Sequence, residues 1–137
     1  MLPDNLPHVR TLDEIKALAS DTDGIIVGSL TDEKVQALVT RCPKLRHLIA
    51  DGNNRVTDAS FGPLKTLQKL ENLDLEWSSV SDAGLHHLLE IPLLRWVDLT
   101  FCKGVTLKGL KELRRAKPNL EIASQFPLDS DASAHFG

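Results

Sequence analysis

The chain has 137 residues and a mass of 15.1 kDa, with 42% apolar and 26% charged residues. This length argues for one domain, and a composition close to the globular average excludes a disordered chain, a collagen-like chain and a disulfide miniprotein. The formal net charge of −3 gives no reason to expect binding to nucleic acid or to an anionic membrane, since both require a concentrated positive field. Leucine supplies 24 residues against four phenylalanines, two tryptophans, one methionine and no tyrosine, and such uniformity indicates repetition.

The N-terminal residues and the two cysteines narrow the class of protein further. The chain starts without a positive segment followed by an apolar one, and no apolar run approaches the ~18 residues of a membrane helix. We therefore expect a cytoplasmic protein that makes no membrane contact. Cys42 and Cys102 form no CxxC pair, so we expect two buried free thiols rather than a zinc or redox site, and no cofactor.

Residues 1–29 predict a helix followed by a strand. Thr11 and Glu14 have the spacing of a capping box, and the apolar residues that follow extend a helix over residues 11–19. The apolar run Gly24–Gly28 predicts a strand. Since a stack of repeats exposes apolar edges unless special units cover them, we expect this segment to be an N-terminal cap and degenerate repeat.

Residues 30–126 carry a pattern that recurs about every 25 residues. Its first phrase, Leu-x-x-Leu-x-Leu or a close relative, begins at Leu45, Leu70 and Leu94, which lie 25 and then 24 residues apart. A weaker copy begins at Leu120. Because the last four positions of the phrase alternate between apolar and other residues, each copy predicts one short strand.

A second phrase follows each loop and predicts a helix. It consists of Val or Leu, then Thr or Ser, then in most copies Asp, and two apolar residues three positions apart come after it. The hydroxyl and the carboxylate are suited to cap a helix, and the apolar pair supplies its buried face. The phrases are Leu30-Thr-Asp, Val56-Thr-Asp, Val80-Ser-Asp and Val105-Thr-Leu, with the pairs Val35/Leu38, Phe61/Leu64, Leu85/Leu88 and Leu110/Leu113.

With both phrases in several copies, the sequence resembles the leucine-rich repeat proteins, and in particular their cysteine-containing, F-box-associated subclass. Cys42-Pro-Lys-Leu45 is similar to the start of that repeat, Cys102-Lys-Gly-Val105 to its middle and Val80-Ser-Asp82 to its end, whereas Leu107 departs from the family's Asp. The resemblance covers residues 30 to about 122. It implies an α/β solenoid of about three full repeats plus degenerate terminal repeats, with a short parallel sheet on the concave side and helices on the convex side. Residues 127–137 are expected to form a flexible tail.

In such a stack the strand residues between the core positions face a partner. They are expected to form two columns, of which one extends to Ile122 and the other to Ser124. Exposed aromatic residues are enriched in binding hot spots, and adjacent aspartates favour a basic or mixed-charge segment of another protein. Two alternatives are that the aromatic rings fold inward and that the aspartates bond to loop backbone. The predicted protein-binding residues are His47, Ile49, Asn72, Asp74, Glu76, Trp77, Trp96, Asp98 and Phe101.

These features predict a monomeric, non-enzymatic protein-interaction module, an adaptor or assembly factor, that binds no nucleic acid. The resemblance also admits a substrate receptor of a ubiquitin ligase or a bacterial effector, although residues 1–30 are too short and polar for an F-box. A remote alternative is a metal-dependent hydrolase that uses His47, Asp74 and Asp98, but no catalytic or metal-binding sequence motif supports one. The locally basic segment 103–117 is a second candidate surface.

Overall fold

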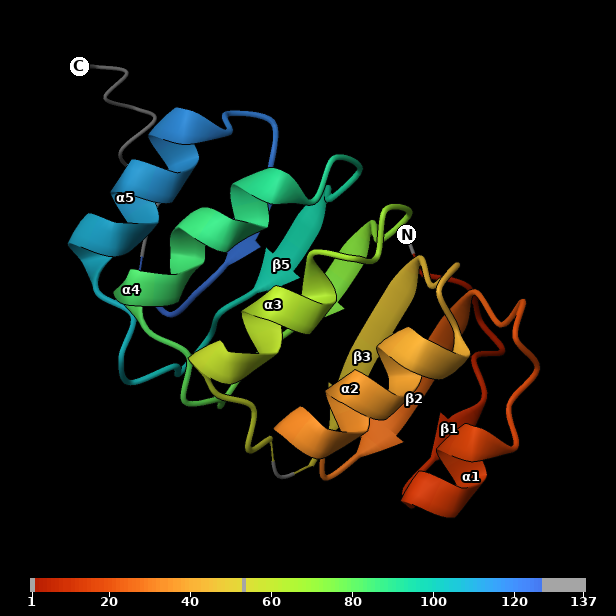
Figure 1. Ribbon diagram of the computed structural model, residues 1–137. Coiled ribbons are helices and arrows are strands. Elements are labelled where there is room, and N and C mark those ends of the chain that lie inside the picture. The colour runs from red at the N-terminus through yellow and green to blue at the C-terminus, as the bar shows by residue number, and fades with distance from the viewer. Residues whose placement is uncertain (1, 53, 127–137) are drawn as a thin grey trace.

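The computed structural model describes residues 2–52 and 54–126 (Figure 1). All six strands pair in parallel in one sheet, and their spatial order is their order in the sequence. Each crossover therefore places the next strand beside the previous one. The strands are β1 (His8–Val9), β2 (Gly24–Gly28), β3 (His47–Asp51), β4 (Asn72–Asp74), β5 (Trp96–Asp98) and β6 (Glu121–Ala123).

Short helices connect the strands and lie in one layer on one face of the sheet (Figure 1). No helix among the described residues covers the opposite face of this α/β fold, although Leu6 of the N-terminal segment lies over it beside Gly24 and His47. We call it the uncovered face because no helix packs on it. None of these helices is both long and apolar enough to cross a lipid bilayer. The helical segments are α1 (Leu12–Lys16), α2 (Asp32–Arg41), the 3₁₀ turn η1 (Asp58–Ser60), α3 (Phe61–Leu64), α4 (Asp82–Leu85), the 3₁₀ segment η2 (His86–Glu90) and α5 (Leu107–Ala116).

The predicted elements of the N-terminal segment are present. Thr11 caps α1 and forms the expected capping box with Glu14, although the helix ends at Lys16 rather than at residue 19. The predicted strand Gly24–Gly28 is β2. Strand β1 was not predicted because its two residues are too few to form an alternating pattern; it pairs with β2 through His8 and Val9.

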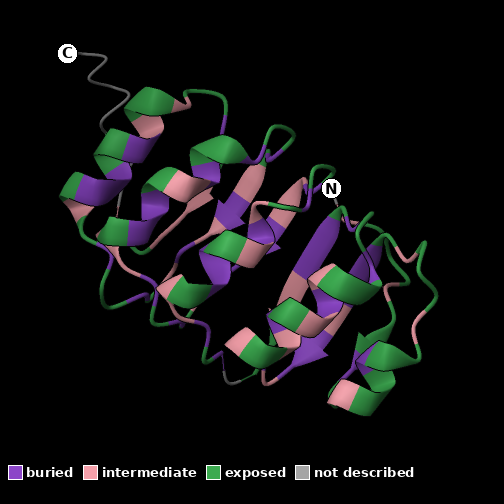
Figure 2. Cartoon of the chain, viewed as in Figure 1, coloured by how far each residue is buried: buried purple, intermediate pink, exposed green. Residues whose placement is uncertain are grey.

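Leucine and valine side chains fill the space between the sheet and the helices. Leu48, Leu73 and Val97 are aligned across β3, β4 and β5, and each is at most 1% exposed. All four predicted apolar pairs of the helices are buried, and Figure 2 shows buried residues on the helix surfaces that face the sheet. Both cysteines are buried and free, as predicted. Since burial of one such side chain contributes about 2 kcal/mol, this aligned core is the main source of stability.

The Thr/Ser–Asp phrase works differently from the prediction. Thr31, Thr57 and Thr106 do cap the following helical segment, but Ser81 makes no such bond. The Asp of each phrase instead accepts hydrogen bonds from the backbone N–H and the hydroxyl of the Thr or Ser in the next copy. These pairs are Asp32 with Thr57 (2.9 and 2.6 Å), Asp58 with Ser81 (2.8 and 2.5 Å) and Asp82 with Thr106 (2.9 and 2.5 Å).

Two glycines allow these aspartates to lie close to the next helical segment. A Cβ atom on Gly109 would overlap Oδ1 of Asp82, and one on Gly84 would lie 2.7 Å from Oδ1 of Asp58. At the corresponding position of the last copy, Leu107 has no carboxylate and packs against the core instead. Each aspartate thus joins one copy of the sequence pattern to the following one.

The pairing of β6 corrects one sequence prediction. Trp96 pairs with Glu121, and Asp98 pairs with Ala123, so the predicted columns do not extend to Ile122 and Ser124. Ile122 instead packs against the core. The connection from the helical layer to β6 has one residue fewer than the connection to β5, which shifts the strand by one position. The predicted tail, residues 127–137, lies outside the described residues.

Candidate binding surface

The uncovered face of the sheet brings together most of the predicted binding residues. Side chains alternate along a strand, so the neighbours of the buried Leu48, Leu73 and Val97 point to this face. His47 aligns with Asn72, Asn72 aligns with Trp96, and Asp74 aligns with Asp98. Ile49 is half-buried beside Ile26 of β2. The sequence therefore predicted the register of β3, β4 and β5 correctly.

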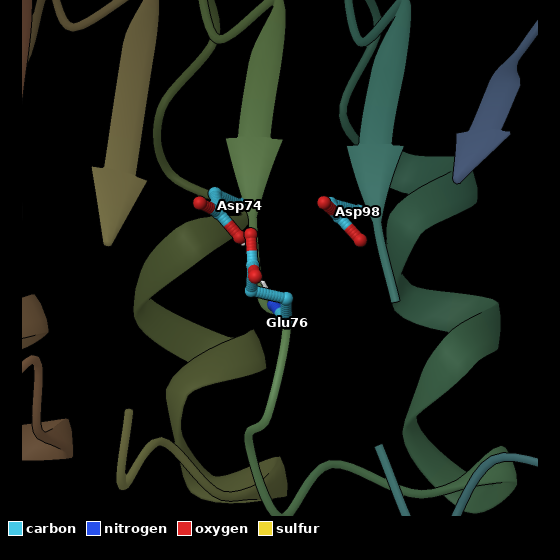
Figure 3. Close-up of side chains that lie close together, drawn as sticks. All are labelled: Asp74, Glu76 and Asp98. Atoms are coloured by element: carbon cyan, nitrogen blue, oxygen red, sulfur yellow. Dashed lines mark hydrogen bonds between the residues drawn. The ribbon is translucent and has the colours of Figure 1, made fainter. Parts of the chain in front are cut away.

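Three carboxylates meet at the C-terminal ends of β4 and β5, as Figure 3 shows. Oxygen atoms of Asp74, Glu76 and Asp98 all lie within 4.8 Å of one another, and we call these three residues the acidic cluster. Asp74 is only 4% exposed, and its Oδ1 accepts the backbone N–H of Glu76 at 3.0 Å. Asp98 accepts the backbone N–H of Thr100 at 2.9 Å. Both aspartates thus bond to loop backbone, which was the alternative that the sequence allowed for them.

The acidic cluster holds negative charge at an electrostatic cost. Burial raises the pKa of Asp74 from 3.8 to about 7, and the charges of Glu76 and Asp98 add to this rise, while backbone hydrogen bonds from Glu76 and Ala50 oppose it. Burial and the charge of Asp98 also raise the pKa of Glu76. A cation placed against these oxygens would relieve this repulsion.

Two exposed aromatic rings lie directly after the strands of the acidic cluster. Trp77 is 57% exposed and Phe101 is 46% exposed, and their ring centroids are 4.5 Å apart at an interplanar angle of 32°. The rings therefore do not fold inward. Trp77 donates its backbone N–H to the carbonyl of Thr100, and Phe101 donates its own to Oε1 of Gln125, both at 2.9 Å. We call Trp77 and Phe101 the aromatic pair.

The backbone under the aromatic pair has an unusual conformation. Trp77 and Phe101 have φ values of 65° and 58°, in the left-handed region that bulky residues rarely occupy. Gly52, in the loop after β3, has a φ of 80°. The fold therefore imposes a left-handed residue in these loops, and at two of them the sequence places an aromatic ring where glycine or asparagine is favoured.

His47 lies apart from the acidic cluster. Its ring is buried, and Asn72 donates its amide to Nδ1 at 2.8 Å. Burial, followed by the charge of Arg46, holds the pKa of His47 below its usual range, which favours the neutral ring. The third side chain close to Asp74 and Asp98 is Glu76 rather than His47. The structure thus does not assemble the three residues of the hydrolase alternative.

At the opposite ends of the strands lies an ion-pair network that the sequence analysis missed. Arg46 donates to Glu71 at 2.7 Å, and Arg95 lies 3.5 Å from the same carboxylate. The Arg46 guanidinium holds the pKa of Glu71 below its usual range. Each of these residues directly precedes its strand, so the alignment of the strands that predicted the columns could also have predicted that these three side chains are neighbours. The two strand ends consequently differ in charge.

The chain matches no model of a known protein family and no curated protein. Its fold defines its class: an α/β protein with one parallel sheet whose strands follow the order of the sequence and whose helices lie on a single face.

Proposed function

We propose that the chain is a leucine-rich repeat module, an α/β solenoid of about three full copies with a degenerate copy at each end. The order of the strands supports this proposal, and so does the alignment of Leu48, Leu73 and Val97, which hold the same position in successive copies of the sequence pattern. Residues 1–29 would then be the N-terminal cap and residues 30–126 the repeats.

We further propose that this module is monomeric and non-enzymatic, and that it binds another protein as an adaptor or assembly factor. The aromatic pair carries this proposal, because two exposed rings in mutual contact beside an uncovered sheet face resemble the anchors of protein interfaces. The acidic cluster favours a partner with a basic or mixed-charge segment and disfavours nucleic acid, whose phosphates it repels.

The aromatic pair can be removed without disturbing the core. Asparagine tolerates the left-handed region, so the double variant Trp77→Asn/Phe101→Asn removes both rings and relieves the backbone. Leu93→Asn is the matched control, because Leu93 is 50% exposed and lies in the turn before β5, away from the aromatic pair.

The test is affinity capture from a lysate of the source cells, with each immobilised protein compared at equal loading. A protein that the original chain and Leu93→Asn retain, and that Trp77→Asn/Phe101→Asn loses, supports the proposal. Equal recovery by the double variant rules out this surface, and the absence of any retained protein rules out the binding function.

Two further candidates can be separated from this proposal. A ligase substrate receptor or a bacterial effector would use the same surface, and the identity of the retained protein distinguishes them. The acidic cluster favours a metal-dependent hydrolase only in a form that uses Glu76 in place of His47, since its three carboxylates are within reach of a single ion. Elemental analysis of the purified protein together with an esterase and phosphatase assay tests this: stoichiometric metal and hydrolytic activity, both of which Asp98→Asn loses, would support the hydrolase instead.

A further inference from the structure

The aromatic pair has the features of a preformed docking surface. Each ring sits on a left-handed residue whose backbone N–H is bonded to the next loop, and each ring packs against the other. Neither ring needs to be reorganised before a ligand can lie on it. A surface with fixed aromatic side chains loses little conformational freedom on binding, and this favours affinity.

The charges beside the rings define the chemistry of the occupant. Glu76 immediately precedes Trp77. Phe101 comes three positions after Asp98, so the Cα atoms of Asp98 and Phe101 lie at most about 11 Å apart. The aromatic pair and the acidic cluster therefore belong to the same two strand ends and the loops that follow them, after β4 and β5. An anionic segment or a membrane of anionic lipid is repelled at this place, whereas a cationic side chain meets complementary charge.

Arginine fits this combination of groups better than lysine does. The guanidinium is planar, stacks on aromatic faces and donates two parallel hydrogen bonds to a carboxylate, whereas the ammonium of lysine is a compact and strongly hydrated charge. We infer that the aromatic pair and the neighbouring carboxylates form a subsite for an arginine side chain of the partner protein. The arginine stem lies along Trp77 and Phe101, and its guanidinium lies against Glu76 and Asp98. This inference rests on the proposed protein-binding function and specifies the residue that is bound.

The two tryptophans provide a direct assay by nuclear magnetic resonance. Each indole N–H gives one signal, and a Trp96→Phe variant assigns them. The probe is an acetylated Gly/Ser peptide with one central arginine, compared with peptides that carry lysine or the neutral citrulline instead. We expect the arginine peptide to shift the Trp77 signal in a saturable manner. Binding should be about five-fold weaker for lysine and more than about ten-fold weaker for citrulline.

Variants of this chain complete the test. Trp77→Asn/Phe101→Asn lacks the Trp77 indole, so its binding is followed through backbone signals of the loops. Glu76→Gln/Asp98→Asn keeps both indoles and is followed through the indole signals. Each double variant should bind the arginine peptide at least about ten-fold more weakly than the original chain does. Leu93→Asn should bind it unchanged. Equal binding of the arginine and citrulline peptides, or full binding by Glu76→Gln/Asp98→Asn, would overturn the inference. If affinity capture still depends on the aromatic pair in that case, the proposed function stands and only the arginine subsite is rejected.

Discussion

Replacement of Asp74 by asparagine is expected to change how the stability of the protein depends on pH. The folded protein raises the pKa of this carboxyl from 3.8 to about 7. Between these values the folded state holds a proton that the unfolded state has lost, so the free energy of unfolding falls as the pH rises. Asparagine cannot ionise, and it keeps an oxygen that can accept the Glu76 N–H.

The size of the effect follows from the shift. Between about pH 5 and about pH 8, two pH units of the shift are expressed, which sets a limit of about 3 kcal/mol. Glu76 and Asp98 beside Asp74 are partly exposed, so screening reduces this limit, and we expect the free energy of unfolding to fall by about 1–2 kcal/mol in the original chain relative to Asp74→Asn. The lowered pKa of His47 acts in the opposite direction, but both proteins contain His47 and the comparison cancels it.

Urea denaturation followed by circular dichroism measures this difference at a series of pH values. Asp51→Asn is the control, because Asp51 is an exposed carboxylate at the end of the neighbouring strand β3. Parallel pH profiles for the original chain and Asp74→Asn would refute the raised pKa of the buried Asp74. A profile for Asp51→Asn that flattened as much as that of Asp74→Asn would refute the specific role of the acidic cluster.

Three further outcomes are expected. Gly109→Ala should destabilise the protein by about 2 kcal/mol in urea, because its Cβ displaces the Asp82 carboxylate, whereas Gly62→Ala, with open space around it, should cost less than about 0.5 kcal/mol. Leu73→Ala should cost about 2–5 kcal/mol by the same assay, since the residue is fully buried. Both cysteines should react slowly with a thiol reagent in the native protein and quickly in denaturant, because burial shields them and raises the pKa of each thiol.

The parallel α/β arrangement could be predicted because each copy contains two separate patterns, one typical of a strand and one typical of a helix. Alternating residues predicted the strands, and the apolar pairs predicted the helices, so the alignment of Leu48 with Leu73 followed from simple counting. The same counting gave the wrong register for β6, because the connection that precedes β6 is one residue shorter than the connection that precedes β5. Leu120 is buried as its place in the pattern predicts, so the pattern did not indicate this difference. A spacing pattern locates the buried residues, whereas the length of the backbone between them sets the register.

The candidate surface was predicted less completely. The alignment of Asp74 with Asp98 follows from the spacing of the copies, but their burial and their approach to Glu76 depend on the turn after the strand. Trp77 has a positive φ, and this affects the direction of its side chain. A positive φ is rare for a bulky residue, so the sequence does not predict it. The partners of Asp32 were missed because they lie 25 to 28 residues away in the chain.

The hydrogen bonds between an Asp and a Thr or Ser all run the same way along the chain, from one copy of the pattern to the next. Each carboxylate bonds to the copy that follows it, so a substitution at Asp58 removes two hydrogen bonds from the segment that begins at Ser81. Loss of one of these carboxylates therefore weakens the link to the copy that follows it. Because Leu107 cannot bond in this way, a further copy joined after α5 by duplication would be held by apolar packing and strand pairing alone. A Leu107→Asp change would supply the missing link.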